Sequence, residues 1–465
     1  MIEKITPEFL ESIGIFELRE IAREIGVYSP TTLKRNILID KILDIYEGRT
    51  KPITKTNRGR PVKTSGKTKD IVDSVKTQAE LNYEFNGIDK SKLLIREPIK
   101  SFEAIAADDG QQCAGILDIT VDGYGIIKVK NYSGSELDAY LPENLIVTYR
   151  LRTGDLIQGM VDNGSGKNIS AMHTILAIND IPVDEVGLRE HFDNLTPIYS
   201  NEKIISFDKN SNKNTNLLSL IAPIGKGQRA IVFAPDKYIK IEFMTNIVDN
   251  IVTNNKDIEM LLLLIGELPE EVTEFKRSIK SGIVHTTFDE LPQNHIKTAE
   301  LVLQRAKRLT ELGKDVVVLI DNLNTLARAY YSKEHKDSGT LEQHSFYFIK
   351  RLLGAARNTE EGGSLSILAC TNSNTEVMFD TLMCKDLKNI GNCEIYLSDY
   401  ESGIKLDVAN SDTSRKELLL NDIELACSKA IKESFKKDCN KTLDKIVPKL
   451  NTSAEEILNT IKKDS

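Results

Sequence analysis

The sequence predicts a multidomain α/β chain whose largest part is a parallel-sheet, nucleotide-binding core. Two apolar runs, Leu261–Ile265 and Val316–Ile320, are each followed within two residues by a carboxylate. Buried parallel strands have this pattern when they deliver an acidic side chain to the C-terminal edge of the sheet. Short alternating strands precede this core, and a helical pattern begins the chain, so we expect three kinds of folded unit.

The composition is that of a globular protein with more than one domain. The 465 residues, of which 40% are hydrophobic and 28% charged, suffice for two or three domains with a sizeable core. No apolar run approaches the roughly 18 residues that span a membrane, and the N-terminus lacks the apolar segment of a signal peptide. We therefore expect a cytoplasmic protein with no membrane partner.

Cysteine usage and charge narrow the classes of site. The six cysteines show no Cys-x-x-Cys spacing, which argues against a zinc site and a disulfide framework. The histidines form no metal-binding pair, so no metal site is predicted from protein ligands alone. The formal net charge of −8 excludes a uniformly basic nucleic-acid binder, and any such surface must be local.

Residues 1–48 are predicted to form a small helical unit. Apolar residues recur at helical spacing over Phe9–Ala22, and Gly26 marks a stop. Ser29–Thr31 then provides a cap before a second helix. Small helix-turn-helix units are common, so this pattern alone indicates no particular function.

Residues 49–110 are predicted to be a disordered, basic linker. The stretch Arg49–Lys69 contains eight basic residues and no acidic one, with Pro, Gly, Ser and Thr between them. Its Arg58–Pro61 segment resembles the core of an AT-hook, whose arginines can lie in a narrow minor groove. The simpler interpretation is a solvated linker with nonspecific, salt-sensitive affinity for nucleic acid.

Residues 111–185 are predicted to form a small β-barrel of the OB or cold-shock type. From Cys113 onward, short segments alternate apolar and polar residues, and turn pairs such as Asp122-Gly123 separate them. We expect four or five strands.

Residues 186–465 are predicted to hold the parallel sheet and the C-terminal helices. The strand Ala230–Ala234 leads into Pro235–Ile241, where a phosphate-binding loop would lie. The tail, Asn421–Ser465, has the pattern of two amphipathic helices on either side of Pro448.

The segment at the phosphate-loop position departs from a working loop. Glycine-rich backbone followed by Lys and Ser or Thr is needed to wrap phosphates and hold Mg²⁺. Lys237 and Lys240 are candidate nucleotide-binding residues, but Ile239 carries a Cβ close to where phosphate oxygens would lie. Ile241 cannot ligate Mg²⁺, and Asp236 adds a negative charge. The sequence therefore predicts the fold of an ATPase domain but not a working phosphate-binding loop.

Several segments resemble the Rho family of bacterial transcription termination factors. Those of the core are LLSLIAPIGKGQRAIVFAP, HTTFDELP, LIDNLNTLARAYY, GAARNTEEGGSLSILA and SRKELLL. REIAREIGVYSPTTLKRNILIDKIL resembles the family's N-terminal helical domain, and DGYGIIKV and YRLRTGD resemble its RNA-binding barrel. The resemblance covers nearly the whole chain and implies a RecA-like, P-loop-type ATPase domain that assembles as a hexameric ring.

The resemblance implies three catalytic positions. Glu267 stands where the family polarises the attacking water, and Asp321 stands where it holds Mg²⁺ through water. Arg415 stands where an arginine finger reaches the neighbouring subunit's nucleotide, a contact that can be worth about 10³–10⁵ in rate. The implied cofactor is ATP with Mg²⁺, and the altered phosphate loop leaves open that there is none.

Other positions depart from the family pattern. Gly266 and Leu268 replace an aspartate and an arginine, Thr325 replaces an arginine, and the aromatic residue that packs on adenine has no counterpart. The first RNA-gripping loop, between Tyr331 and Arg351, is shorter than in the family, and Met378 replaces the lysine of the second. A motor that neither cradles ATP nor grips RNA is not expected to be a helicase.

The resemblance also implies RNA-binding residues on the barrel. Tyr124 and Tyr140 stand at aromatic contact positions, and Lys128 stands at a basic one. Ile126 replaces a second aromatic residue, and Val147-Thr148 replaces a usually basic pair. Because stacking contributes roughly 1–3 kcal/mol per base, we expect a weakened primary RNA site.

Three functions remain open from the sequence. The favoured one is a catalytically impaired Rho paralogue that binds single-stranded RNA, assembles with itself or with an authentic Rho, and modulates termination, with RNA polymerase as a further candidate partner. The alternative is an active RNA-dependent ATPase with an atypical phosphate loop. The third is a nucleic-acid-binding module that uses the basic linker and the helical unit.

Overall fold

The chain divides into two compact units, Met1–Ile99 and Lys100–Ser465. The computed structural model describes residues 112–129, 132, 137–162, 170–208, 211–278, 282–334, 341–388 and 390–462, and in the first unit residues 22, 37, 39 and 41–43. The helical unit predicted at 1–48 and the linker predicted at 49–110 therefore lie outside the described residues, apart from those isolated positions. Every element below belongs to the second unit.

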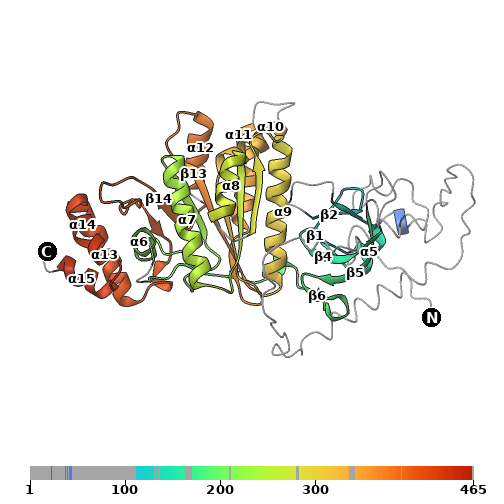
Figure 1. Ribbon diagram of the computed structural model, residues 1–465, viewed down its shortest axis with the longest axis horizontal. Coiled ribbons are helices and arrows are strands. Elements are labelled where there is room, and N and C mark those ends of the chain that lie inside the picture. Colours follow the sequence, from blue (N-terminus) through green and yellow to red (C-terminus); the bar gives the residue numbers. More distant parts are fainter. Residues whose placement is uncertain are drawn as a thin grey trace, which may run out of the picture. The chain divides into compact units, whose positions relative to one another are not determined.

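The first part of this unit is a closed β-barrel (Figure 1). Its strands run in the order β3-β2-β1-β4-β5-β6, and pairing of β3 with β5 closes it, which confirms the predicted barrel. The alternating pattern gives it a core that includes Leu117, Ile127 and Met172. The elements are β1 (Gln112–Ile119), β2 (Gly125–Lys128), β3 (Ala139–Leu141), α5 (Glu143–Thr148), β4 (Leu156–Asp162), β5 (Ala171–Ile178), β6 (Ile181–Pro182) and the 3₁₀ turn η4 (Val183–Glu185).

The second part is an α/β core with a sheet in the order β10-β9-β11-β13-β8-β14-β15. The pairs from β10 to β14 are parallel, as predicted. After η5 (Phe192–Asn194) and β7 (Pro197–Ile198), its elements are α6 (Lys213–Ile221), β8 (Arg229–Ala234), α7 (Lys237–Asn254), β9 (Glu259–Glu267), α8 (Pro269–Ser278), β10 (Gly282–Thr287), α9 (Pro292–Glu311), β11 (Val316–Ile320), α10 (Leu323–Glu334), α11 (Leu341–Gly354), β12 (Arg357–Thr359), β13 (Ser364–Asn372), α12 (Met378–Leu387), β14 (Cys393–Tyr396) and β15 (Asp412–Thr413).

The strands of this sheet are apolar throughout because both faces are covered. Along β9, Leu262 and Leu264 pack into the layer with α7 and the C-terminal helices, whereas Leu263 and Ile265 pack into the layer with α9, α10 and α11. Strands buried on both faces appear as continuous apolar runs rather than alternating ones. This explains the two runs from which the core was predicted.

The C-terminal segment forms three α-helices, where the sequence predicted two. They are α13 (Asp422–Lys437), α14 (Cys439–Ile446) and α15 (Ala454–Lys462), with a 3₁₀ turn at Val447–Lys449. The extra break lies at Asp438, whose extended backbone ends α13 and whose carboxylate accepts a hydrogen bond of 3.1 Å from Lys441 N. Asp favours this capping position, and the amphipathic pattern concealed it. Among the helices that the structure describes, none is both long and apolar enough to cross a bilayer.

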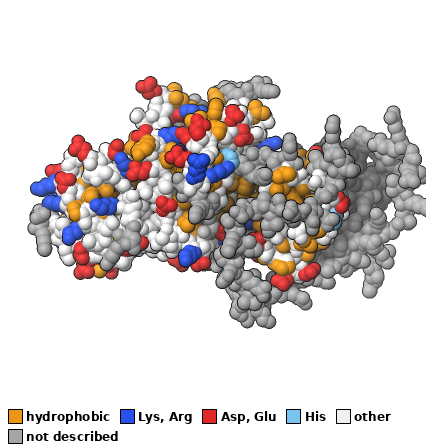
Figure 2. Space-filling model, viewed as in Figure 1, with side chains coloured by type: hydrophobic (Ala, Val, Ile, Leu, Met, Phe, Trp, Pro, Cys, Tyr) orange, Lys and Arg blue, Asp and Glu red, His pale blue; other side chains and the backbone are white. Residues whose placement is uncertain are grey.

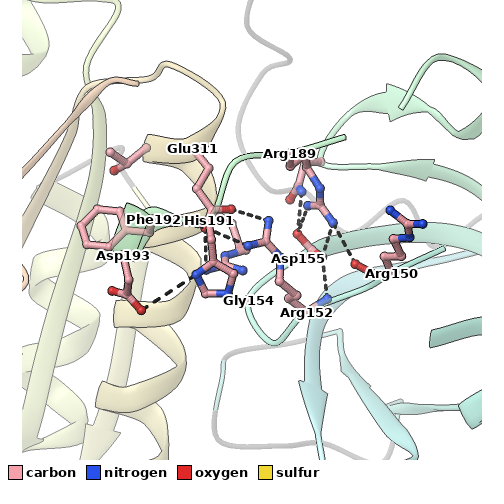
Figure 3. A network of polar contacts seen from close by, with 12 residues as sticks. Arg150, Arg152, Gly154, Asp155, Arg189, His191, Phe192, Asp193 and Glu311 are labelled. Carbon is pink, nitrogen blue, oxygen red and sulfur yellow. Dashed lines mark hydrogen bonds and ion pairs between the residues drawn. The ribbon is translucent and has the colours of Figure 1, made fainter. Parts of the chain in front are cut away.

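The barrel packs on α9 through buried polar contacts (Figure 3). The Arg152 guanidinium donates to both oxygens of Glu311, at 3.0 and 2.7 Å, and Arg308 pairs with the same carboxylate at 2.8 Å. Phe192 N also donates to Glu311, whose side chain is fully buried. A buried carboxylate that satisfies two guanidinium groups holds the barrel to the core in one geometry.

A second group of contacts joins the same surfaces. Arg305 on α9 is buried and donates to Asn179 Oδ1 at 2.5 Å. Asn179 donates in turn to Asp155, at 2.7 Å, and Asp155 pairs with Arg189. Burial alone would raise the pKa of Asp155, but the hydrogen bonds and charge of Arg189 hold it below its usual range.

Gly154 lies close to the backbone of α9. Its φ is +93°, and a Cβ there would lie 2.6 Å from Arg305 N. We predict that Gly154→Ala lowers the free energy of unfolding by about 2 kcal/mol or more, because it combines left-handed strain with a backbone clash. Gly187→Ala is the control, since nothing lies within 4 Å of a Cβ there. Equal effects of the two substitutions in urea unfolding would contradict the packing described.

Candidate functional site

Two carboxylates meet at the C-terminal edge of the sheet, as the strand ends predicted. Glu267 is the last residue of β9, and Asp321 directly follows β11, the neighbouring parallel strand. Asp321 Oδ1 accepts a hydrogen bond of 2.8 Å from Ile265 N, which fixes it against the end of β9. Both side chains are buried.

Gly266 shapes the end of β9. Its φ is +67°, and the register with β10 shifts there, so that Ile265 and Glu267 face successive residues of β10. A Cβ at this position would lie 2.9 Å from Thr325 Cγ2 on α10. Two departures from the family pattern, at positions 266 and 325, are therefore in contact, and the small side chains accommodate each other.

Helix α7 begins where a phosphate loop would lie. Strand β8 ends at Ala234 and α7 starts at Lys237, so only Pro235 and Asp236 connect them. The Asp236 carboxylate accepts a hydrogen bond of 2.9 Å from Ile239 N. Without glycines the segment becomes the first turn of the helix, and a carboxylate caps the N–H groups that would otherwise attract an anion.

The two lysines of this turn contact the acidic pair. Lys237 Nζ forms ion pairs with Glu267 and, at 2.6 Å, with Glu271 on α8. Lys240 is buried, and its Nζ lies 3.4 Å from Glu267 Oε1. The residues predicted to bind nucleotide are thus brought together with the predicted catalytic glutamate, as an internal ion-pair cluster.

This cluster sets the protonation of the two carboxyl groups. Burial alone would raise the pKa of Glu267, but hydrogen bonding with Asp321 and Glu271, the charge of Lys240 and a hydrogen bond donated by Lys237 lower it to about 2. Burial, together with the neighbouring Glu267 charge, raises the pKa of Asp321 well above its usual range. Glu267 is therefore ionised at neutral pH, while burial and the neighbouring charge favour the protonated form of Asp321.

A pocket of about 210 Å³ opens beside the cluster and contains an arginine that the sequence analysis missed. Arg328 on α10 lines it and pairs with Asp380 on α12, which is itself buried. The sequence feature that could have identified Arg328 is its three-residue spacing from Thr325. This spacing places Arg328 about one turn further along the same face of α10. Arg328 supplies a cation near position 325, although its charge is engaged by Asp380.

Arg415 lies at the opposite edge of the sheet from the acidic pair. It follows β15, whose Thr413 pairs with Cys393, and Cys393 pairs with Ala230 at the beginning of β8. Its guanidinium lies over the ring of Tyr199, with 5.0 Å between Cζ and the ring centroid, and its Nε donates to Glu417 at 2.6 Å. The structure does not bring Arg415 to Glu267 within one chain.

The predicted RNA-binding residues share the outer face of the barrel. The rings of Tyr124 and Tyr140 lie 5.3 Å apart between centroids, and Tyr140 is 37% exposed. Lys128 is on the same face of β2, but its Nζ forms an ion pair of 2.9 Å with Asp138. Ile126 is the cross-strand partner of Tyr140. The structure thus supplies an aromatic platform and shows that its lysine is already paired.

Two regions correspond to the predicted RNA-gripping loops. Residues 335–340, between α10 and α11, lie outside the described residues. Met378 begins α12 with 73% of its side chain exposed, so an apolar group is presented where the family has a lysine.

Comparison with known proteins agrees with this architecture. Residues 113–184 match the RNA-binding domain of the Rho termination factor, and residues 215–400 match the nucleotide-binding domain of the ATP synthase alpha/beta family. The transcription termination factor Rho of Bacillus subtilis is 38% identical over 317 residues, which are 66% of this chain and 74% of the relative.

The chain belongs to the Rho family of transcription termination factors. Rho 1 of Ehrlichia chaffeensis is 34% identical over 379 residues, covering 77% of this chain and 88% of the relative. Rho of Borreliella burgdorferi is 38% identical over 321 residues, covering 67% of this chain and 62% of the relative. A Rho-type nucleotide-binding domain implies ATP with Mg²⁺ as cofactor.

The residues at the site do not fit that cofactor. The α7 N-terminus is capped by Asp236, the Ile239 side chain is buried where a loop would approach phosphate, and Lys240 faces Glu267. A triphosphate would have to displace the Asp236 cap and separate two lysines from a buried carboxylate. An uncompensated buried charge costs about 3–5 kcal/mol, so this rearrangement opposes binding.

The cluster predicts a stability effect. Lys240→Ala should lower the free energy of unfolding by about 3 kcal/mol, because Glu267 loses a buried partner. Lys256→Ala is the control, since Lys256 is exposed and should change stability by less than about 0.5 kcal/mol. Urea unfolding of both variants measures the difference, and a neutral Lys240→Ala would contradict the ion-pair cluster.

The lowered pKa of Glu267 also predicts a pH dependence. Its pKa is about 2 in the folded chain against a usual value of 4.5, so its ionised form contributes stability above about pH 4.5. This contribution is lost as the pH falls toward 2. We expect the stability difference between the wild type and Glu267→Gln to be constant above about pH 5 and to close below it. A pH-independent difference would show that Glu267 titrates normally.

Proposed function

We propose that this protein is a Rho-family RNA-binding protein that does not hydrolyse ATP and that modulates transcription termination through RNA binding and assembly. The observation that carries the proposal is the phosphate-loop position itself. There Asp236 caps α7, and both lysines pair with the glutamate that should activate water. Positioning and electrostatic stabilisation are the main sources of catalysis in phosphoryl transfer, and this cluster opposes both.

Assembly is supported by the location of Arg415. An arginine at the sheet edge opposite the acidic pair cannot complete a site in its own chain, but it can present itself to a neighbouring copy. Its guanidinium is exposed at the surface, where it lies over Tyr199 and pairs with Glu417. The chain has this arginine although its phosphate loop is altered. This combination favours a subunit that still joins a ring, with its own copies or with an authentic Rho.

Mixed assembly would give such a subunit a regulatory effect. In a ring whose ATPase sites are each built from two neighbouring chains, a subunit without a phosphate loop contributes no working site of its own. Its Arg415 can still contribute to the site of the adjacent chain. A few copies would therefore reduce the activity of a whole ring without preventing RNA from binding to the barrels.

ATP hydrolysis tests the catalytic part of the proposal. We expect the purified protein to release phosphate at the background rate, with or without cytidine-rich single-stranded RNA, and Lys240→Ala to give the same rate. RNA-stimulated release that is lost in Lys240→Ala would instead establish an active terminator with an atypical loop.

Size-resolved mixing tests the assembly part. The protein is expected to elute as an assembly larger than one chain, alone or after mixing with an authentic Rho, and Arg415→Ala should not abolish RNA binding by the barrel. A chain that remains a monomer under both conditions would refute the assembly proposal.

A further inference from the structure

The pocket beside the ion-pair cluster has an almost entirely polar lining. Apart from Ala234 and Gly266, every described residue that lines it has a polar side chain, and none has an aromatic ring. Its volume of about 210 Å³ is several times the roughly 30 Å³ that one water occupies in the liquid, and lies below the roughly 300–1,000 Å³ of drug-sized ligand sites. The pocket therefore fits a small ligand that is held by hydrogen bonds.

The cations that line this pocket are paired with carboxylates that line it as well. Lys237 and Lys240 pair with Glu267, and Arg328 pairs with Asp380. Figure 2 shows acidic and basic side chains interspersed over the described part of the face it draws, without a broad basic surface there. A phosphorylated ligand would have to break these ion pairs, whereas an uncharged ligand leaves them in place.

Asn324 on α10 has a hydrogen-bond donor without a partner among the described residues. Its Oδ1 accepts hydrogen bonds from Thr371 Oγ1, at 3.0 Å, and from Asn372 N, at 2.9 Å. These contacts orient the amide so that Nδ2 is the unpartnered atom. The residue lines the pocket and is only 4% exposed. A buried donor without a partner is costly, so a ligand that accepts a hydrogen bond from Nδ2 is favoured.

Asp380 on α12 provides an acceptor in the same pocket. Its Oδ2 pairs with Arg328 and accepts a hydrogen bond of 3.3 Å from Thr375 Oγ1, while Oδ1 has no partner in the part of the chain that the structure describes. Asp380 is 2% exposed, whereas the side chain of Arg328 is 52% exposed. Because solvent already reaches Arg328, its side chain can turn to admit a ligand without leaving water.

From these observations we propose that the pocket binds a small uncharged polyhydroxyl compound, namely a sugar or a polyol without phosphate groups. A hydroxyl group both donates and accepts, so neighbouring hydroxyl groups of one molecule satisfy Asp380 Oδ1 and Asn324 Nδ2 together. An apolar ligand would satisfy neither atom. The proposal goes beyond the proposed function, because it assigns a ligand to a site that does not fit ATP.

Ligand titration of the full chain tests this proposal. Saturation-transfer NMR is recorded with myo-inositol and D-glucose, and with glucose 6-phosphate as the charged analogue. We expect both uncharged compounds to bind, and the phosphate ester to bind at least about tenfold more weakly, since it must break the ion pairs. This comparison needs no variant. Binding of neither uncharged compound, or equal binding of the phosphate ester, would overturn the proposal.

Two substitutions locate the ligand. Asn324→Ala and Asp380→Asn should each raise the dissociation constant of the uncharged compounds about tenfold, because each removes or weakens a hydrogen bond at a buried partner. Asp386→Asn is the matched control, since Asp386 also lies on α12 and pairs with Lys350, but does not line the pocket. Unchanged circular dichroism shows that a variant is folded. Unchanged dissociation constants in both folded variants would place the ligand elsewhere and overturn the proposal.

The outcomes are distinguishable from those of the proposed function. Failure to bind an uncharged compound overturns the ligand assignment and leaves the ATP hydrolysis test unaffected. RNA-stimulated ATP hydrolysis would overturn the proposed function, whereas the titrations with myo-inositol and D-glucose would still decide the ligand.

Discussion

A buried glutamate that must be neutralised is the constraint on which the α/β core depends. Glu267 ends a central strand in a fully covered sheet, where an unpaired carboxylate would cost several kcal/mol. Two lysines from the first turn of α7 meet this need. They can do so only because the turn is helical, and Asp236 makes it helical by capping it. The helical turn at the phosphate-loop position and the pairing of Glu267 at the sheet edge therefore have one structural cause.

Much of the fold and part of the site follow from local pattern. Continuous apolar strands with acidic ends predicted both the parallel sheet and the proximity of Glu267 to Asp321. The absence of glycine predicted the altered loop. The local pattern could not predict ion pairs between distant segments. Two such ion pairs join Arg328 to Asp380 and Lys128 to Asp138. They depend on which helices and strands become neighbours in the fold. The break at Asp438 was hidden because amphipathic spacing continues across it.

The barrel and the α/β core are joined through α9. Glu311 and Arg305 near the end of that helix contact Arg152 and Asn179 of the barrel. Their buried, saturated hydrogen bonds leave little freedom for the barrel to rock on the sheet. A base bound at the proposed RNA-binding residues Tyr124 and Tyr140 would thus be held at a fixed position relative to the edge where Glu267 lies.

The unfolding temperature of the protein with and without millimolar ATP and Mg²⁺ tests directly whether the ion-pair cluster excludes nucleotide. A ligand that binds only the folded state raises this temperature, and the rise grows with the logarithm of its free concentration once that exceeds the dissociation constant. No change is expected, because the lysines that would hold phosphate are engaged by Glu267. A clear rise that disappears in Lys240→Ala would show instead that nucleotide binds and displaces the ion pairs.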